Sequence, residues 1–180
     1  MRRGLSLTRT GGADRLDALI RANASDILAY LERRIDPRAD AADVLSETFI
    51  VAWKKARHAP TDEISGRMWL FAIARNTLLN ARRATRRRLA ATNRLRVELA
   101  QTPTARGADA ADPLDVRGAV SQLPDALREL VELIHWDGFS ISDAAQMTGI
   151  SASTARSRYA AAKERLRAVL VVQPEGSTRR

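Results

Sequence analysis

The chain contains no cysteine and is poor in the other residues that usually build metal or cofactor sites. Without cysteine, disulfides and thiolate metal sites are excluded. Its two histidines, His58 and His135, lie far apart and lack the spacing of metal ligands, so each is interpreted as a surface or core residue. The sequence has no glycine-rich phosphate-binding loop. We therefore expect no bound metal and no cofactor.

Long apolar segments are missing as well. Residues 1–13 include arginines and a Gly-Gly pair, but no apolar stretch of the length found in signal peptides. No run approaches the roughly 18 apolar residues of a membrane span. We therefore expect a cytoplasmic chain that makes no membrane contact of its own, with a disordered tail over residues 1–13.

Acidic residues are outnumbered by basic ones. The 180 residues include 30 Lys and Arg against 21 Asp and Glu, which gives a formal net charge of +9. This balance favours a polyanionic partner, most simply DNA or RNA. Apolar residues make up 45% of the chain, enough for the core of one medium domain or two small ones.

Apolar residues recur at helical spacing, and no strand pattern appears, so the sequence predicts an all-α fold. In the N-terminal half, capping residues and prolines divide this pattern into four helices. Their expected ranges are 14–22, 25–35, 41–57 and 67–88, the last continuing at most to residue 96. Residues 14–96 are thus predicted to form a four-helix bundle.

The fourth of these helices has two distinct faces. One is an apolar stripe formed by Leu70, Ile73, Ala74, Thr77, Leu78 and Ala81. The other is a polar and then basic stripe formed by Asn76, Asn80, Arg83 and Arg87. Asparagine can pair with a base edge, and arginine with phosphate or guanine. The stripe therefore suits a nucleic acid, although a solvated basic face on an ordinary bundle helix remains the alternative.

Composition changes after this helix. Residues 97–113 include the segment QTPTARGADAADP, which has no apolar periodicity and is predicted to be a flexible linker. Helical periodicity returns over residues 114–172, in four helices divided at Pro124, Asp137-Gly138 and Gly149. Residues 173–180 form a polar tail.

Residues 141–168 have the pattern of a helix-turn-helix. Gly149 can supply the positive φ of the turn. The second helix begins with hydroxyl and basic residues, which suit phosphate and base-edge contacts in a major groove. These residues are Ser153, Thr154, Arg156, Ser157 and Arg158, followed by Lys163. The alternative is a plain helical hairpin in a protein–protein module.

Three segments together resemble the extracytoplasmic-function (ECF) sigma factors of the sigma-70 superfamily. They are ADVLSETFIVAWKKA at 42–56, WLFAIARNTLLNARR at 69–83 and LPDALRELVELIHWDGFSISDAAQMTGISASTARSR at 123–158. The segments stand in the family's order and spacing. The resemblance implies that residues 14–96 are sigma region 2 and residues 114–172 are sigma region 4.

The resemblance also implies a partner for each surface. The helix with Asp43, Leu45, Glu47, Thr48 and Phe49 looks like the segment that docks on the polymerase core, formed by the beta-prime and beta subunits. The acidic edge formed by its carboxylates agrees with a protein partner, because it would avoid DNA. The stripe around Asn76 and Asn80, with phosphate contacts from Arg82, Arg83, Arg86 and Arg87, looks like the part that opens and binds the minus-ten element.

Region 4 then looks like the module that binds the minus-thirty-five element, through the six residues at the start of the last helix. The match weakens at Ala160, Ala161 and Ala162, where members of the family often have larger or basic residues. Relatives in this family commonly act in stress responses under the control of an anti-sigma protein, so such a partner is expected here.

Two other functions remain possible from the residues alone. A stand-alone helix-turn-helix regulator would use the N-terminal bundle for dimerisation or ligand binding, which would not explain the run of arginines. An enzyme acting on nucleic acid would need a catalytic cluster. Asp43 and Glu47 share a helical face, but no histidine, cysteine or second carboxylate cluster accompanies them. We therefore expect a sigma factor that is not an enzyme.

Overall fold

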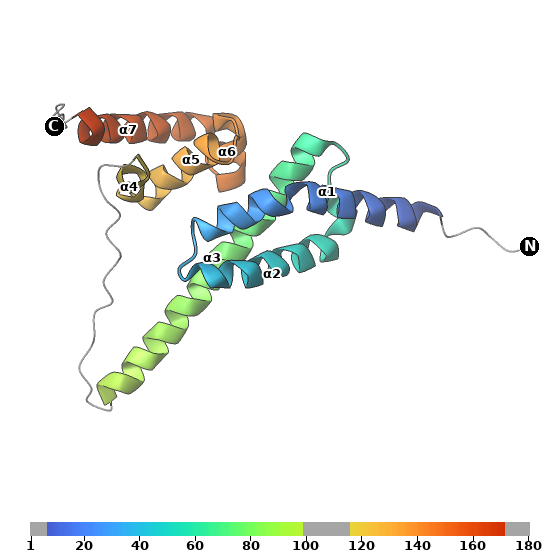
Figure 1. The fold of residues 1–180 in the computed structure, drawn as a ribbon, viewed down its shortest axis with the longest axis horizontal. Coiled ribbons are helices and arrows are strands. Elements are labelled where there is room, and N and C mark those ends of the chain that lie inside the picture. The colour runs from blue at the N-terminus through green and yellow to red at the C-terminus, as the bar shows by residue number, and fades with distance from the viewer. Residues whose placement is uncertain (1–6, 99–115, 172–180) are drawn as a thin grey trace, which may run out of the picture. The chain divides into compact units, whose positions relative to one another are not determined.

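The computed structural model describes residues 7–98 and 116–171, and every regular element within these ranges is a helix (Figure 1). The all-α prediction is therefore confirmed. The chain divides into two compact units, Met1–Pro103 and Thr104–Arg180. Residues 99–115, which include most of the predicted linker, and the predicted tail at 173–180 lie outside the described residues.

Within residues 7–98, the N-terminal unit has three α-helices rather than the four predicted. Helix α1, Leu7–Glu32, is continuous across the expected boundary near Ser25. The buried side chain of Asn23 donates to the Leu19 carbonyl at 2.8 Å, so it stays within the helix instead of ending it. Residues 7–13 belong to this helix, so the prediction of a disordered tail is wrong for them, and residues 1–6 lie outside the described residues. The Gly-Gly pair lowers helix propensity by about 1 kcal/mol per residue, which does not end a helix that continues into the core.

The other two helices of this unit differ from the predictions mainly at their ends. Helix α2, Ala41–Lys54, lies between two short 3₁₀ helices, Arg38–Asp40 and Ala56–His58, so it ends before Arg57. Helix α3, Glu63–Glu98, is the longest element and includes residues 97 and 98, which were assigned to the linker.

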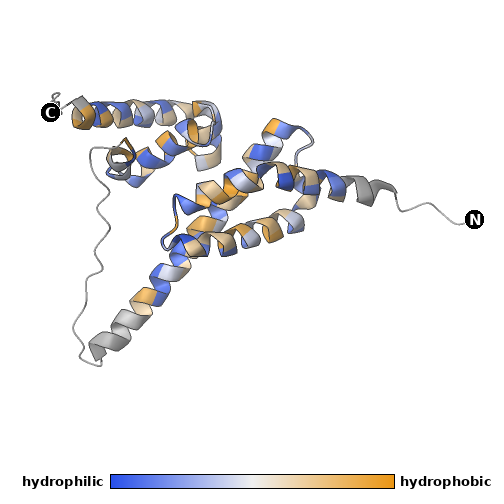
Figure 2. Cartoon of the chain, in the orientation of Figure 1, coloured by the Kyte–Doolittle hydropathy of each residue, from blue (hydrophilic) through white to orange (hydrophobic). Residues whose placement is uncertain are grey.

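The core of the N-terminal unit lies where α1, α2 and α3 pack against one another. The Tyr30 and Phe71 rings meet edge to face, with centroids 5.5 Å apart. Other fully buried side chains include those of Leu16, Ile27, Leu31 and Leu70. Residues 82–88 of α3 include five arginines, and this part of the helix is largely hydrophilic (Figure 2). One helix thus contributes both to the core and to an exposed basic surface.

The C-terminal unit contains four helices in the described range. They are α4 (Val116–Ser121), α5 (Asp125–His135), α6 (Ile141–Thr148) and α7 (Ala152–Val171). Val120, Leu123, Val131 and Ala162 form a buried cluster.

The turn between α6 and α7 has the expected helix-turn-helix geometry. Ser140 and Asp143 form a capping box at the start of α6, and Gly149 ends this helix with a φ of 70°. Only glycine adopts such a φ at little cost. The capping box and the glycine together fix the position where α7 begins.

Candidate nucleic-acid interface and associated surfaces

The polar stripe of α3 faces away from the core, as the sequence predicts. Asn76, Asn80 and Arg83 are exposed, and the Arg83 Nη1 lies 3.4 Å from the Asn80 Oδ1. Arg86 and Arg87 are exposed further along the helix. Residues three, four, seven and eleven positions apart share a helix face, so the amides and guanidinium groups form one surface of hydrogen-bond donors and acceptors. Such a surface can contact bases and phosphates.

The sequence suggested that Arg82 binds phosphate on this surface, but its side chain makes a different contact. Its side chain is half-buried, and its Nη2 donates to the Arg34 carbonyl at 2.6 Å. Carbonyls at a helix C-terminus lack partners within the helix, and Arg82 satisfies one just beyond the end of α1. Arg82 is therefore better assigned to holding α1 against α3 than to binding phosphate.

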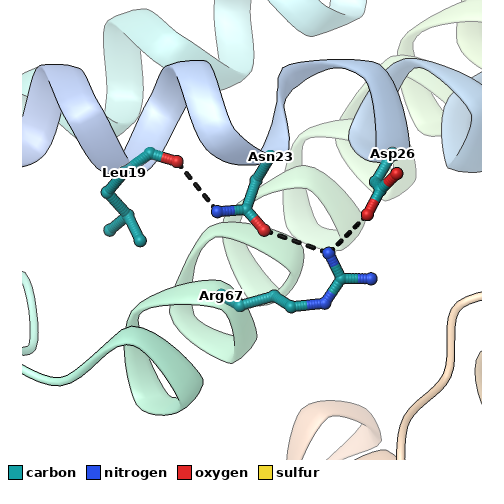
Figure 3. Close-up of polar contacts among 4 residues, drawn as sticks. All are labelled: Leu19, Asn23, Asp26 and Arg67. Carbon is teal, nitrogen blue, oxygen red and sulfur yellow. Dashed lines mark hydrogen bonds and ion pairs between the residues drawn. The ribbon is translucent and has the colours of Figure 1, made fainter.

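A polar network fixes the beginning of α3 to α1 (Figure 3). Arg67 Nη1 donates to Asn23 Oδ1 at 3.0 Å and to Asp26 Oδ2 at 2.6 Å. The two helices approach closely beside this network, since a Cβ added at Gly66 would lie 2.9 Å from a Leu19 methyl group. The network and the close crossing hold the start of α3 against α1.

Asp62 sets the first residue of α3. Its Oδ1 accepts a hydrogen bond from the Ser65 amide at 2.8 Å, which satisfies one of the unpaired amides at the helix N-terminus. This backbone hydrogen bond, together with one from the Ser65 side chain, lowers the pKa of Asp62. The cap explains why α3 begins at Glu63, four residues before the predicted start at residue 67.

Helix α2 presents an acidic and apolar surface. Asp43 and Glu47 are exposed, and Leu45 and Phe49 are half-buried. Thr48 is different: it is fully buried, and its hydroxyl donates to the Val44 carbonyl at 2.7 Å. The assignment of Thr48 to a docking surface is therefore wrong, since it faces the core with Val44 and Ala52.

The sequence interpretation missed two apolar residues on α2. Ile50 is 53% exposed and Trp53 is 45% exposed. Apolar residues cover more of the circumference of α2 than its buried stripe requires, and this excess was the available signal. We define Asp43, Glu47, Phe49, Ile50 and Trp53 as the α2 patch.

The start of α7 is organised by Ser151. The Ser151 Oγ accepts from the Thr154 amide at 3.1 Å, and it lies 2.8 Å from both the Ser153 and Thr154 hydroxyl oxygens. Arg156 and Ser157 are exposed on the next turn, and Arg158 is half-buried. The six predicted residues therefore include two whose hydroxyls take part in the helix cap.

No group of three or more His, Cys, Asp or Glu side chains that could hold a metal ion occurs within residues 7–98 and 116–171. Among the helices described, none is long and apolar enough to cross a membrane.

Comparison with known proteins gives matches to both units. The Sigma-70 region 2 family matches residues 19–88, and the family described as Sigma-70, region 4 matches residues 114–166. The ECF RNA polymerase sigma factor SigL of Mycobacterium tuberculosis is 31% identical over 180 residues, which cover 96% of this chain and 100% of that protein. The RNA polymerase sigma factor CarQ of Myxococcus xanthus is 31% identical over 166 residues, covering 90% and 92% of the two chains.

A solved structure shows the same fold. The sigma factor RpoE of Bartonella quintana, in complex with the anti-sigma factor NepR, aligns with a TM-score of 0.66 and 24% identity. The alignment covers 88% of this chain and 98% of that chain.

Proposed function

The chain belongs to the ECF group of the sigma-70 family of RNA polymerase sigma factors, and from this premise we propose which of its surfaces bind the polymerase and the promoter. As a sigma factor, it binds core polymerase and directs initiation at specific promoters. The stand-alone regulator is not favoured, because the region 2 match covers most of the bundle that this alternative assigns to dimerisation or ligand binding.

The exposed stripe of α3 is the minus-ten surface. Asn76 and Asn80 contact bases of the opened strand, while Arg83, Arg86 and Arg87 contact phosphates. The observation that supports this assignment most directly is the exposure of both amides on a helix whose opposite face is buried. Unstacking a base costs roughly a few kcal/mol, which the new contacts and neutralised phosphates must offset.

The α2 patch is the polymerase-docking surface. Exposed apolar side chains bordered by carboxylates suit a protein surface with basic residues around an apolar centre. The same carboxylates disfavour DNA on this face.

The start of α7 binds the minus-thirty-five element as a duplex. Arg156 and Ser157 lie within reach of base edges, and Arg158 and Lys163 border them. Ser153 and Thr154 contribute their hydroxyls next to the N-terminus of the helix, where backbone amides favour phosphate.

Control by an anti-sigma protein fits the exposure of the α2 patch. RpoE of Bartonella quintana is bound to such a protein, and a similar partner here would cover the patch and compete with the polymerase. The chain acts with polymerase on chromosomal DNA in the cytoplasm. Because the polymerase catalyses RNA synthesis, the sigma factor needs no cofactor or active site of its own.

Transcription with purified core polymerase tests the minus-ten assignment. On a genomic library with sequenced start sites, the wild-type chain should direct initiation from a defined promoter set. Asn76→Ala and Asn80→Ala should each cost about 1–3 kcal/mol in promoter opening, because each removes contacts to a base. Opening can be followed by permanganate reactivity of unpaired thymines, and polymerase affinity by co-purification.

Ser25→Ala, at an exposed position on α1, provides a neutral control and should leave opening unchanged. An equal loss of polymerase binding and promoter opening in the asparagine variants would contradict the assignment. If the wild-type chain supports no initiation from any template, the proposed function as a whole is wrong.

A further inference from the structure

We propose that His135 and Tyr159 extend the minus-thirty-five surface to α5, where with Lys163 they bind one phosphate of the DNA strand beside the recognition helix. This inference rests on the proposed function of α7. It gives a role to His135, for which the sequence alone predicts only a surface or core position.

The three side chains form a layered cluster. The Tyr159 hydroxyl lies 2.8 Å from His135 Nε2, and the two rings stack with centroids 5.8 Å apart and an interplanar angle of 26°. Lys163 Nζ lies 5.2 Å from the centroid of the Tyr159 ring. The ring is therefore in contact with a histidine from α5 and a lysine from its own helix.

The cluster adjoins the proposed base-contacting residues. Tyr159 follows Arg156 by three positions and precedes Lys163 by four, and residues at these spacings are neighbours on a helix surface. Arg156, Lys163 and His135 are exposed, whereas Tyr159 is half-buried with its ring against the core cluster of the unit. The tyrosine thus joins the core to the edge of the DNA-binding surface.

The turn of α7 that follows Tyr159 supplies no polar side chain. Ala160 and Ala161 are exposed, and Ala162 is fully buried, so this turn has no side chain that can donate to DNA. Phosphate contacts usually position such a helix in its groove. The His135–Tyr159–Lys163 cluster places donors next to the alanines, and their chemistry matches an anionic oxygen.

The hydrogen-bond geometry allows a defined role for each group. A hydroxyl has one hydrogen and two lone pairs. When His135 Nε2–H donates to the Tyr159 oxygen, the phenolic hydrogen is free to donate to a phosphate oxygen. Lys163 supplies the positive charge beside it. In this arrangement Tyr159 and Lys163 bind the phosphate, and His135 is a positioning residue that orients the hydroxyl.

A first experiment uses the full chain and a fluorescein-labelled duplex of random sequence. Tyr159→Phe, which deletes only the hydroxyl, and His135→Ala should each weaken binding by about 3- to 10-fold. Lys163→Gln should weaken binding and reduce the slope of log affinity against log salt concentration by about 1. His135→Gln keeps an N–H donor and should retain most of the affinity. Gln122→Ala, at an exposed position in the same unit, should change nothing.

A second experiment locates the phosphate. Holoenzyme is bound to a promoter from the start-site map in which single phosphates beside the minus-thirty-five element are replaced by uncharged methylphosphonates. One replacement should weaken the wild-type complex and have a smaller effect on the Tyr159→Phe and His135→Ala complexes, because these variants have lost the Tyr159 contact and keep only that of Lys163. A purely structural role would reduce binding at every position instead.

Unchanged affinity for random duplex in Tyr159→Phe and Lys163→Gln would overturn the inference, and so would a uniform methylphosphonate profile in an active holoenzyme. Failure of the wild-type chain to initiate transcription would instead count against the proposed function. In that case, the random-duplex measurements still decide whether this cluster binds phosphate.

Discussion

At the residue scale, Asp62 connects the ionisation of one carboxylate to the start of α3. Its pKa is lowered by the hydrogen bond from the Ser65 amide, so the folded chain favours the ionised form. The resulting stabilisation is complete above the ordinary carboxyl pKa of about 3.9. It is lost as the pH falls through the lowered value in the folded chain.

Replacing Asp62 by Asn should reduce the acid sensitivity of the N-terminal unit. The asparagine oxygen can still accept from the Ser65 amide but does not titrate in this range. Thermal unfolding of both chains, followed by far-UV circular dichroism at neutral and acidic pH, should show a smaller acid-induced loss for Asp62→Asn. Equal losses in the two chains would show that this cap does not contribute.

The positions of some site residues could be predicted from the sequence, whereas those of others could not. The exposure of Asn76 and Asn80 followed from their position opposite the apolar stripe. The burial of Thr48 could have been predicted too, because Val44, Thr48 and Ala52 recur every four residues. The role of Arg82 could not, since its acceptor at Arg34 lies 48 residues away in the sequence. The roles proposed for the site residues remain predictions.

At the element scale, the contact between α1 and α3 depends on a buried amide. Asn23 is 4% exposed and accepts from Arg67, whereas the Asp26 side chain is 52% exposed. Arg67→Ala would leave the Asn23 oxygen without this donor, and an unsatisfied buried polar group costs about 1–3 kcal/mol. Asp26→Asn removes only an exposed ion pair and should cost less than about 1 kcal/mol.

Urea unfolding of the two variants separates these contributions. If Arg67→Ala and Asp26→Asn destabilise the chain equally, the buried amide is not the important partner.

The continuity of α1 also depends on Asn23, because its side chain bonds within its own helix and across to α3. The sequence indicated a break there, since a polar residue two positions before a serine resembles a helix boundary until its tertiary partner is known.

Two substitutions on helix α2 distinguish residues that bind the polymerase from residues that pack in the core. Trp53→Ala should weaken core polymerase binding by about 2 kcal/mol or more, as expected for a central aromatic residue in an interface. Its effect on folding should be smaller because the side chain is 45% exposed. Thr48→Val alters a fully buried position and should leave polymerase affinity unchanged. Affinities measured by fluorescence titration with core polymerase would contradict the α2 patch if Thr48→Val had the larger effect.

At the scale of the whole molecule, the chain is two helical units with separate cores. Each unit alone offers a small DNA-binding surface, so we expect tight promoter binding to need both. A covalent link makes the second contact intramolecular and can raise overall affinity by about 10²–10⁴. The all-α class and the presence of two modules could be predicted from periodicity, because the apolar pattern stops and restarts around the linker sequence.

Separating the units at this point tests the importance of the link. Met1–Pro103 and Thr104–Arg180, added as two chains to core polymerase, should initiate about 100-fold less efficiently than the intact chain at equal concentration. Run-off transcription measures this, with circular dichroism of each half as the control for folding. Full activity from the mixture would mean that the polymerase alone brings the two units together.

The continuity of α3 restricts how this protein can change during evolution. A straight helix of 36 residues is about 54 Å long, at about 1.5 Å per residue. Inserting or deleting one residue after the buried stretch would rotate every later side chain by about 100° and move the arginines away from the asparagines. Substitutions can therefore adjust promoter preference along α3, whereas variation in length is tolerated only in segments outside this helix.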